Sequence, residues 1–243
     1  MCLNEEELSI IGELARDYDV IVIEDLAYFG MDFRKDYSKP GVAPFQPSIG
    51  KYADDYIILI SSSKIFSYAG QRIGLMAISD HLFERRYPDL LRYYSSDQFG
   101  HAAIYGALYG LSAGVTHSVQ YGLAALLKAV NEGKYRFLDD VREYGEKAKI
   151  MKELFVNHGF NIAYNKDVDE PLANGFYFTI SYPGMTAKKL LEELLFYGIS
   201  AISLEITGSE RNDGLRACVS FVSRDQFDDL KYRLMSFHEN HPV

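Results

Sequence analysis

The stretch SSSKIFSYAGQRIG at residues 61–74 follows directly on the apolar run at residues 56–60. That run is short, continuous and rich in isoleucine, which predicts a strand buried on both faces of a sheet. The polar stretch therefore begins where the chain leaves the sheet. In α/β sheets, ligands bind outside the carboxyl ends of the strands, so this stretch is the first candidate for a binding site.

The residue types within this stretch favour an anionic ligand and covalent chemistry. Arg72 has the geometry to bind a phosphate through two N–H donors, and Ser61 and Ser63 are able to donate to the same group. A lysine beside cationic groups, as Lys64 is here, can be neutral and nucleophilic near pH 7. The alternative is a polar loop with a solvated lysine, which leaves the crowding of Ser, Lys and Arg unexplained.

A second polar segment, Glu24 to Tyr28, follows another apolar run at residues 20–23. It too is predicted to lie at the carboxyl end of a buried strand, where Asp25 and Tyr28 would face a ligand. The alternative is that Asp25 caps the next turn and Tyr28 only packs. On this segment alone, the alternative is the stronger interpretation.

A third segment places Arg216 among apolar residues of a predicted strand at residues 215–221. A guanidinium that is buried or half-buried there needs an anion, and a substrate carboxylate would fit its fork of N–H donors. A structural ion pair with one of the many Asp and Glu residues is at least as good an explanation.

The remaining pattern predicts an α/β layer followed by a smaller α+β domain. Asn4 and Glu7 form a capping-box pattern for an opening helix, and Ser223 and Gln226 repeat it near the end of the chain. The expected elements are strands at 20–23, 56–60, 73–78, 176–180 and 215–221, mostly helix over 81–159, and a helix around 190–195 ended by Gly198. The sequence pattern changes from mostly helical to strands alternating with helices, and we place the domain boundary near Arg136.

Composition excludes several classes of function. The 243 residues carry a net charge of −9, with no basic run, which argues against a nucleic-acid partner. Six histidines and two cysteines show no metal-ligand spacing, so no metal is expected, and Cys2 and Cys218 are interpreted as reduced thiols. No targeting segment or membrane-spanning run is visible, and we expect a soluble cytoplasmic protein.

Taken together, the three segments resemble the class I/II aminotransferases, which are fold-type-I enzymes dependent on pyridoxal phosphate (PLP). In that family an Asp, with a Tyr three residues later, follows one strand, as Asp25 and Tyr28 do. A Ser-x-x-Lys motif follows the next, as Ser61 and Lys64 do, and an Arg comes eight residues after the Lys, as Arg72 does. A carboxylate-binding Arg appears late in the small domain, where this chain has Arg216.

The resemblance implies a role for each residue. Lys64 would hold the cofactor and then move the substrate Cα proton as a general base. Asp25 would keep the pyridine nitrogen protonated, and Tyr28 would hydrogen-bond the phenolic oxygen. The phosphate would bind to Arg72, Ser63 and Ser61, of which Ser61 is the better serine by family position. Arg216 would fix the substrate α-carboxylate.

The same resemblance implies a fold and an activity. Residues 1–136 would be the C-terminal part of the large PLP-binding domain, a remnant of its mixed sheet with helices, and residues 137–243 the small C-terminal domain. The protein would be a homodimer that moves an amino group between an amino acid, with aspartate as one candidate, and a 2-oxo acid. Family members carry a long block before the segment that begins here, so we expect a truncated chain with impaired activity. The alternatives are β-elimination or decarboxylation on the same scaffold, or a non-catalytic interaction module.

Overall fold

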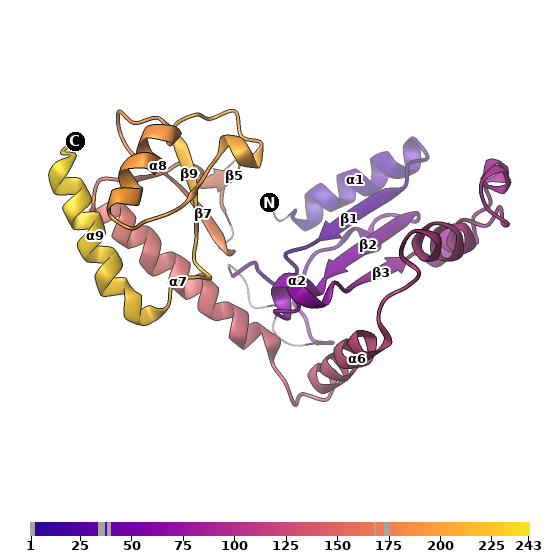
Figure 1. Ribbon diagram of the computed structural model, residues 1–243. Helices are drawn as coiled ribbons and strands as arrows, with labels where there is room; N and C mark the ends of the chain where they lie inside the picture. The colour runs from indigo at the N-terminus through magenta and orange to yellow at the C-terminus, as the bar shows by residue number, and fades with distance from the viewer. Residues whose placement is uncertain (1–2, 34–36, 38–39, 168, 173–174) are drawn as a thin grey trace. The chain divides into compact units, whose positions relative to one another are not determined.

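The computed structural model describes residues 3–33, 37, 40–167, 169–172 and 175–243. Cys2 and part of the loop between residues 31 and 51 lie outside the described residues. By its internal contacts the chain divides into two compact units, drawn in Figure 1. The N-terminal unit contains the described residues up to 30 and from 37 to 138, and the C-terminal unit contains residues 31–33 and those from 139 onward. The domain boundary at residue 136 stays a prediction.

The N-terminal unit is built on a mixed sheet of three strands, in the order β1-β2-β3. Strand β1 (Val22–Leu26) pairs in parallel with β2 (Tyr56–Ser61), and β2 pairs antiparallel with β3 (Gly74–Ile78). The three strands predicted from the apolar runs are thus confirmed, each within a few residues of its predicted limits.

The expected burial of these strands on both faces is wrong. Side chains of β1 alternate between half-buried and exposed, and Ile23 is 62% exposed. Leu75 of β3 is also exposed, and in β2 only Ile57 is buried. The physical reason is the small number of strands: two of the three are edges, and a continuous apolar run does not reveal whether its strand is central.

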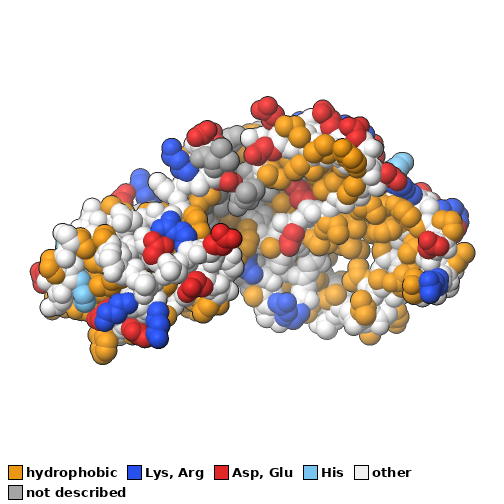
Figure 2. Space-filling model, turned by 90° about the horizontal axis from the view of Figure 1, so that it is seen from above, with side chains coloured by type: hydrophobic (Ala, Val, Ile, Leu, Met, Phe, Trp, Pro, Cys, Tyr) orange, Lys and Arg blue, Asp and Glu red, His pale blue; other side chains and the backbone are white. Residues whose placement is uncertain are grey.

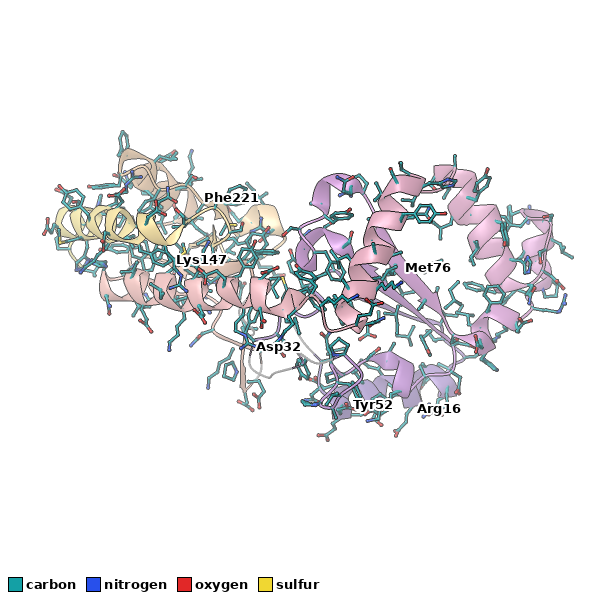
Figure 3. All side chains as sticks on the ribbon, turned by 90° about the horizontal axis from the view of Figure 1, so that it is seen from below. Arg16, Asp32, Tyr52, Met76, Lys147 and Phe221 are labelled. Atoms are coloured by element: carbon teal, nitrogen blue, oxygen red, sulfur yellow. The ribbon has the colours of Figure 1, made fainter. Side chains whose placement is uncertain are left out.

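Helix α1 (Glu5–Asp17) packs with the sheet through Leu8, which is buried with Ile49 and Ala53. The predicted capping box is confirmed: the Asn4 side chain accepts from the Glu7 backbone N–H, and Glu7 accepts from that of Asn4. Arg16 in the last turn donates to the Tyr52 carbonyl, and both side chains are marked in Figure 3. These contacts join α1 to the short helix η1 (Ile49–Lys51) that precedes β2.

From residue 81 onward the N-terminal unit is mostly helical, as predicted, and shorter helical segments lie between β2 and β3. Its segments are α2 (Ser62–Ile65), η2 (Ala69–Gln71), α3 (Asp80–Glu84), η3 (Pro88–Arg92), α4 (Phe99–His101), the π-helix η4 (Ala102–Leu108), α5 (Tyr109–Ser112) and α6 (His117–Asn131). Two glycines permit close approach of aromatic rings: a Cβ would lie 2.2 Å from Phe83 at Gly100 and 2.2 Å from Tyr94 at Gly106. The absence of a side chain at Gly100 and Gly106 therefore lets the two rings pack directly against the helix backbone.

The C-terminal unit holds an antiparallel sheet of four strands in the order β4-β7-β9-β8. Its strands are β4 (Asn161–Ile162), β7 (Tyr177–Ser181), β8 (Ile202–Ser203) and β9 (Gly214–Cys218), and a separate pair joins β5 (Lys166–Asp167) to β6 (Glu170–Pro171). The helices are α7 (Phe137–Asn157), α8 (Ala187–Phe196), η5 (Glu205–Thr207), η6 (Arg224–Gln226) and α9 (Phe227–Asn240). Strand β9 ends at Cys218, earlier than predicted, and the Ser223–Gln226 capping box is confirmed.

One large core holds the C-terminal unit together. The apolar faces of α7, α8 and α9 bury Phe155, Leu194 and Phe237 against Phe178 and Leu215 of the central strands. Polar side chains border this core. Arg224 pairs with Glu143 of α7 and holds the pKa of that carboxyl below its ordinary value. Lys147, labelled in Figure 3, is almost fully buried, and loss of hydration lowers its pKa.

No helix within the described part of the chain is long and apolar enough to cross a membrane. The described residues also contain no group of three or more His, Cys, Asp or Glu side chains placed to hold a metal ion. Cys218 is a free thiol.

Helix α8 offers a matched test of the C-terminal core. Leu194 is 0% exposed, whereas its neighbour Leu195 is 55% exposed. We expect Leu194→Ala to lower the free energy of unfolding by about 2–5 kcal/mol, because the deletion leaves a cavity among well-packed side chains. Leu195→Ala makes the same chemical change at the surface and should stay within about 0.5 kcal/mol of the parent. Urea unfolding followed by circular dichroism measures both, and equal losses would contradict this core.

Candidate functional site

Strand direction brings the polar segments of the N-terminal unit to one edge of its sheet. Because β1 and β2 run in parallel, with Leu26 opposite Ile60, both strands end at the same edge. Strand β3 runs the other way and begins there, with Gly74 opposite Ser61. Segments 27–28, 61–64 and 72–73 therefore meet at this edge, where α2 lies in Figure 1.

Lys64 and Tyr28 are in contact at this edge. The Lys64 Nζ lies 5.6 Å from the centroid of the Tyr28 ring, within the range of a cation–π interaction. Lys64 is half-buried on α2, and Tyr28, in the turn after β1, is 46% exposed. Two side chains 36 positions apart in the sequence are thus placed together, and both remain accessible to a ligand.

Asp25 is the second-last residue of β1, opposite Leu59 of β2, and it is exposed. One carboxylate oxygen, Oδ1, accepts a hydrogen bond of 3.0 Å from the backbone N–H of Ala27. This is the local capping bond that the alternative interpretation of the segment anticipates. The bond uses one oxygen, and the other accepts no hydrogen bond from the described residues.

The three serines at the junction of β2 and α2 make different contacts. The Ser61 hydroxyl accepts from the Ser63 backbone N–H at 3.2 Å and begins α2, which leaves its own proton free to be donated. Ser62 is 1% exposed and donates to the Ile73 carbonyl, so it ties α2 to the start of β3. Ser63 is half-buried beside Lys64. Ser62 was not singled out in the sequence because nothing distinguishes it from its neighbours.

The loop between α2 and β3 contains strained backbone. Ser67 and Arg72 both have positive φ, of 52° and 53°, although neither is glycine. Such conformations cost on the order of 1–3 kcal/mol each and persist where the surrounding structure imposes them, often at binding sites. The exposed Arg72 guanidinium donates one bond of 2.9 Å to the Ala69 carbonyl, and its other donors are open to a ligand.

Arg216 belongs to the C-terminal unit and lies on β9 between two strands. Its direct neighbours across the sheet are Thr179 of β7 and Ile202 of β8, neither of which carries a charge. Among the described residues Arg216 has no ion pair, and its Nε is buried without a hydrogen-bond acceptor. The guanidinium instead lies over the ring of Tyr177, 4.3 Å from the centroid. The structural ion pair considered as an alternative is therefore not formed with any described residue.

Tyr177 belongs to none of the three sequence segments that predict the site. Its contact with Arg216 depends on the pairing of β7 with β9, which joins residues 39 positions apart. A sequence pattern shows that each segment is a strand but not which strands are neighbours or in which register. No signal in the sequence identifies this pair.

Comparison with known proteins places the chain among aminotransferases. It is 27% identical over 174 residues to the "Probable aspartate aminotransferase" of Methanocaldococcus jannaschii, which covers 63% of this chain and 44% of the relative. The kynurenine aminotransferase of Pyrococcus horikoshii, solved with PMP, has a TM-score of 0.66 at 20% identity and covers 99% of this chain and 53% of that one.

Two further solved structures agree. The aromatic aminotransferase of Pyrococcus horikoshii gives a TM-score of 0.71 at 17% identity over 98% of this chain and 56% of its own. The α-aminoadipate aminotransferase LysN of Thermus thermophilus, complexed with N-(5'-phosphopyridoxyl)-L-leucine, gives 0.67 at 18% identity over 97% of this chain and 54% of its own. This chain therefore spans about half the length of the relatives it matches.

At such identities the structural likeness concerns the fold, and it confirms the predicted partial fold-type-I architecture. Identity of family comes from the sequence itself: the profile of the family described as "Aminotransferase class I and II" matches residues 1–234. This chain belongs to the class I and II aminotransferase family.

Proposed function

We propose that this chain is part of a pyridoxal-phosphate-dependent aminotransferase that moves an amino group between an amino acid and a 2-oxo acid. Residues 1–136 would belong to the large cofactor-binding domain and residues 137–243 to the small domain. The observation that carries the proposal is the Lys64 amine beside Tyr28, at the sheet edge where β1 and β2 end. Family membership supplies the context for that pair.

The groups at this edge fit the cofactor. The Lys64 amine suits the aldehyde of the cofactor, the Tyr28 phenol its phenolic oxygen and the Asp25 carboxylate its pyridine nitrogen. The Arg72 guanidinium and the hydroxyls of Ser61 and Ser63 suit its phosphate. Asp25 has a second carboxylate oxygen, and Arg72 has further N–H donors, that make no hydrogen bond to a described residue and can bind a ligand. When bound, the cofactor supplies an electron sink that stabilises negative charge at the substrate Cα.

Each side chain would then do ordinary chemistry. Lys64 would hold the cofactor and, once the substrate displaces it, act as a general base that moves the proton from the substrate Cα to the cofactor carbon C4′. Asp25 would hold a proton on the pyridine nitrogen through its ionised carboxylate. Tyr28 would donate its hydroxyl proton to the phenolic oxygen. Arg72, with the hydroxyls of Ser61 and Ser63, would bind the phosphate.

Arg216 is proposed to bind the substrate α-carboxylate. Within the described part of the chain its guanidinium, flanked by Thr179 and Ile202, has no anionic partner, so a carboxylate would neutralise its charge. Bidentate binding would also restrict rotation of the substrate and so orient the Cα–H bond. Aspartate is carried over as one candidate substrate from the name of the Methanocaldococcus jannaschii relative.

A homodimer is the proposed assembly, and the surface of the N-terminal unit supports it. Figure 2 shows hydrophobic side chains over much of this unit. Its helical part exposes Tyr105, Tyr109, Leu111 and Tyr121 close together in the sequence. Exposed apolar surface of this kind is typical of interaction sites.

A half-reaction tests the proposed activity. Addition of an amino acid to the protein with excess PLP should convert the aldehyde form to pyridoxamine phosphate, with release of the 2-oxo acid. Release of the oxo acid with the aldehyde form retained would indicate elimination instead and would contradict the proposal. Because the chain spans about half of its relatives' length, we expect weak cofactor binding and slow turnover from these 243 residues alone.

Lys64 is predicted to be the attachment point of the cofactor. Borohydride reduction of the protein in excess PLP, followed by peptide mapping, should place the label on Lys64. Lys64→Arg should abolish this label, and Lys51→Arg, which alters an exposed lysine of the same unit, should leave it unchanged. A label spread evenly over surface lysines would show that this edge of the sheet is not the site.

Arg216→Lys is predicted to weaken amino-acid binding on the order of 10- to 100-fold, because an ammonium group cannot reproduce the two parallel bonds of a guanidinium. Cofactor binding should stay nearly unchanged, since none of the proposed cofactor ligands lies in the C-terminal unit. Titrations with PLP and with the amino acid separate the two effects. Equal loss of both affinities would mean that Arg216 has a structural role.

A further inference from the structure

We propose that Tyr177 is a positioning residue that holds the guanidinium of Arg216 in the orientation in which it meets the substrate carboxylate. The inference rests on the proposed function, because it assumes that Arg216 binds that group. It assigns a role to Tyr177, which belongs to no sequence motif, and it concerns only the C-terminal unit.

Strand register places the two side chains on one face of the sheet. Tyr177 is directly opposite Cys218, and Arg216 is directly opposite Thr179. Opposed residues of antiparallel strands project to the same face, and so do residues two apart on one strand. Tyr177 and Arg216 are thus diagonal neighbours, whereas Leu215 and Ala217 project to the other face and enter the core.

The backbone of Arg216 is fixed from both sides. Strand β9 pairs with β7 through Thr179 and with β8 through Ile202, so Arg216 starts from a central strand. The long side chain would still have many rotamers, and a ligand would have to restrict them on binding. Contact of its tip with the Tyr177 ring, 4.3 Å from centroid to Cζ, restricts them beforehand.

The ring also compensates for the burial of the Arg216 Nε, which without such a contact would be energetically unfavourable. The Arg216 Nε is buried and has no hydrogen-bond acceptor among the described residues. An aromatic face carries partial negative charge, so the ring stabilises the cation where water is excluded. The terminal nitrogens are not among the buried unpaired atoms, and they are left to bind the carboxylate.

A second arginine–tyrosine pair in the same unit provides a contrast. Arg211 lies 5.5 Å from the Tyr164 ring centroid, but it also makes two hydrogen bonds to Asp213 and one to the Ala163 carbonyl. Its position is set by those bonds, and the ring is redundant. The Arg216 guanidinium makes no hydrogen bond or ion pair with any described residue, so its orientation depends on the Tyr177 ring.

The experiment follows the Arg216 Nε–H resonance in the full chain labelled with ¹⁵N-arginine, in excess PLP. The resonance is assigned by its loss in Arg216→Lys, and pyruvate is titrated as the carboxylate probe. Burial should protect this proton from exchange with water, and the ring should shift it upfield. Tyr177→Leu should abolish the upfield shift and weaken pyruvate binding roughly 3- to 30-fold. Tyr177→Phe keeps the aromatic face and should stay within about threefold of the parent.

Tyr164→Leu is the matched control, because it removes the other ring and should change neither quantity. If pyruvate moves the resonance but Tyr177→Leu binds it as tightly as the parent, the positioning role is wrong. The same conclusion follows if Tyr164→Leu weakens binding equally. If pyruvate leaves the resonance of the unaltered protein unchanged, the carboxylate role of Arg216 fails, and the inference fails with it.

Discussion

Parallel hydrogen bonding between β1 and β2 ends two strands at the same edge of a sheet, and the antiparallel β3 begins there. Everything at the candidate cofactor site depends on this arrangement. The strands deliver Tyr28, Lys64 and Arg72 from three separate parts of the chain to one place. Ser62 reinforces the arrangement from within, since its buried hydroxyl joins α2 to the residue that precedes β3. The grouping of these side chains at the edge therefore results from the directions of the strands rather than from the conformation of any one loop.

The two units handle charge in different ways. At the edge of the N-terminal sheet, Lys64 and Arg72 are accessible to solvent and water can hydrate them. Arg216 is held within a sheet whose neighbouring residues are uncharged, so a ring replaces part of its hydration. Arg224 of the same unit, by contrast, pairs with the carboxylates of Glu143 and Glu146. An unpaired guanidinium in this setting has a stronger electrostatic attraction for a carboxylate than one already in an ion pair.

Much of the fold was predictable because its signals are local. The capping box at Asn4, the three apolar runs of the first sheet and the helix stop at Gly198 each depend on a few adjacent residues. The family motif likewise predicts which residues belong to the site. The exposure of Ile23 was not predictable, because the same apolar run of sequence is found in edge strands and in central strands. The Tyr177–Arg216 contact was also beyond reach, since it follows from strand order and register.

Gly74 shows how a residue without chemistry of its own can be as restricted as one that has it. A Cβ at this position would lie 2.9 Å from the Ile60 carbonyl oxygen, closer than real Cβ atoms approach such a group. Any side chain would push β3 away from β2 at the residue opposite Ser61. Given the proposed role of Lys64, a genetic screen for loss of function would consequently recover changes at Gly74 and at Lys64 alike. Soluble yield would tell the two classes apart, since a change at Gly74 alters how the chain folds, whereas a change at Lys64 would alter only the proposed chemistry.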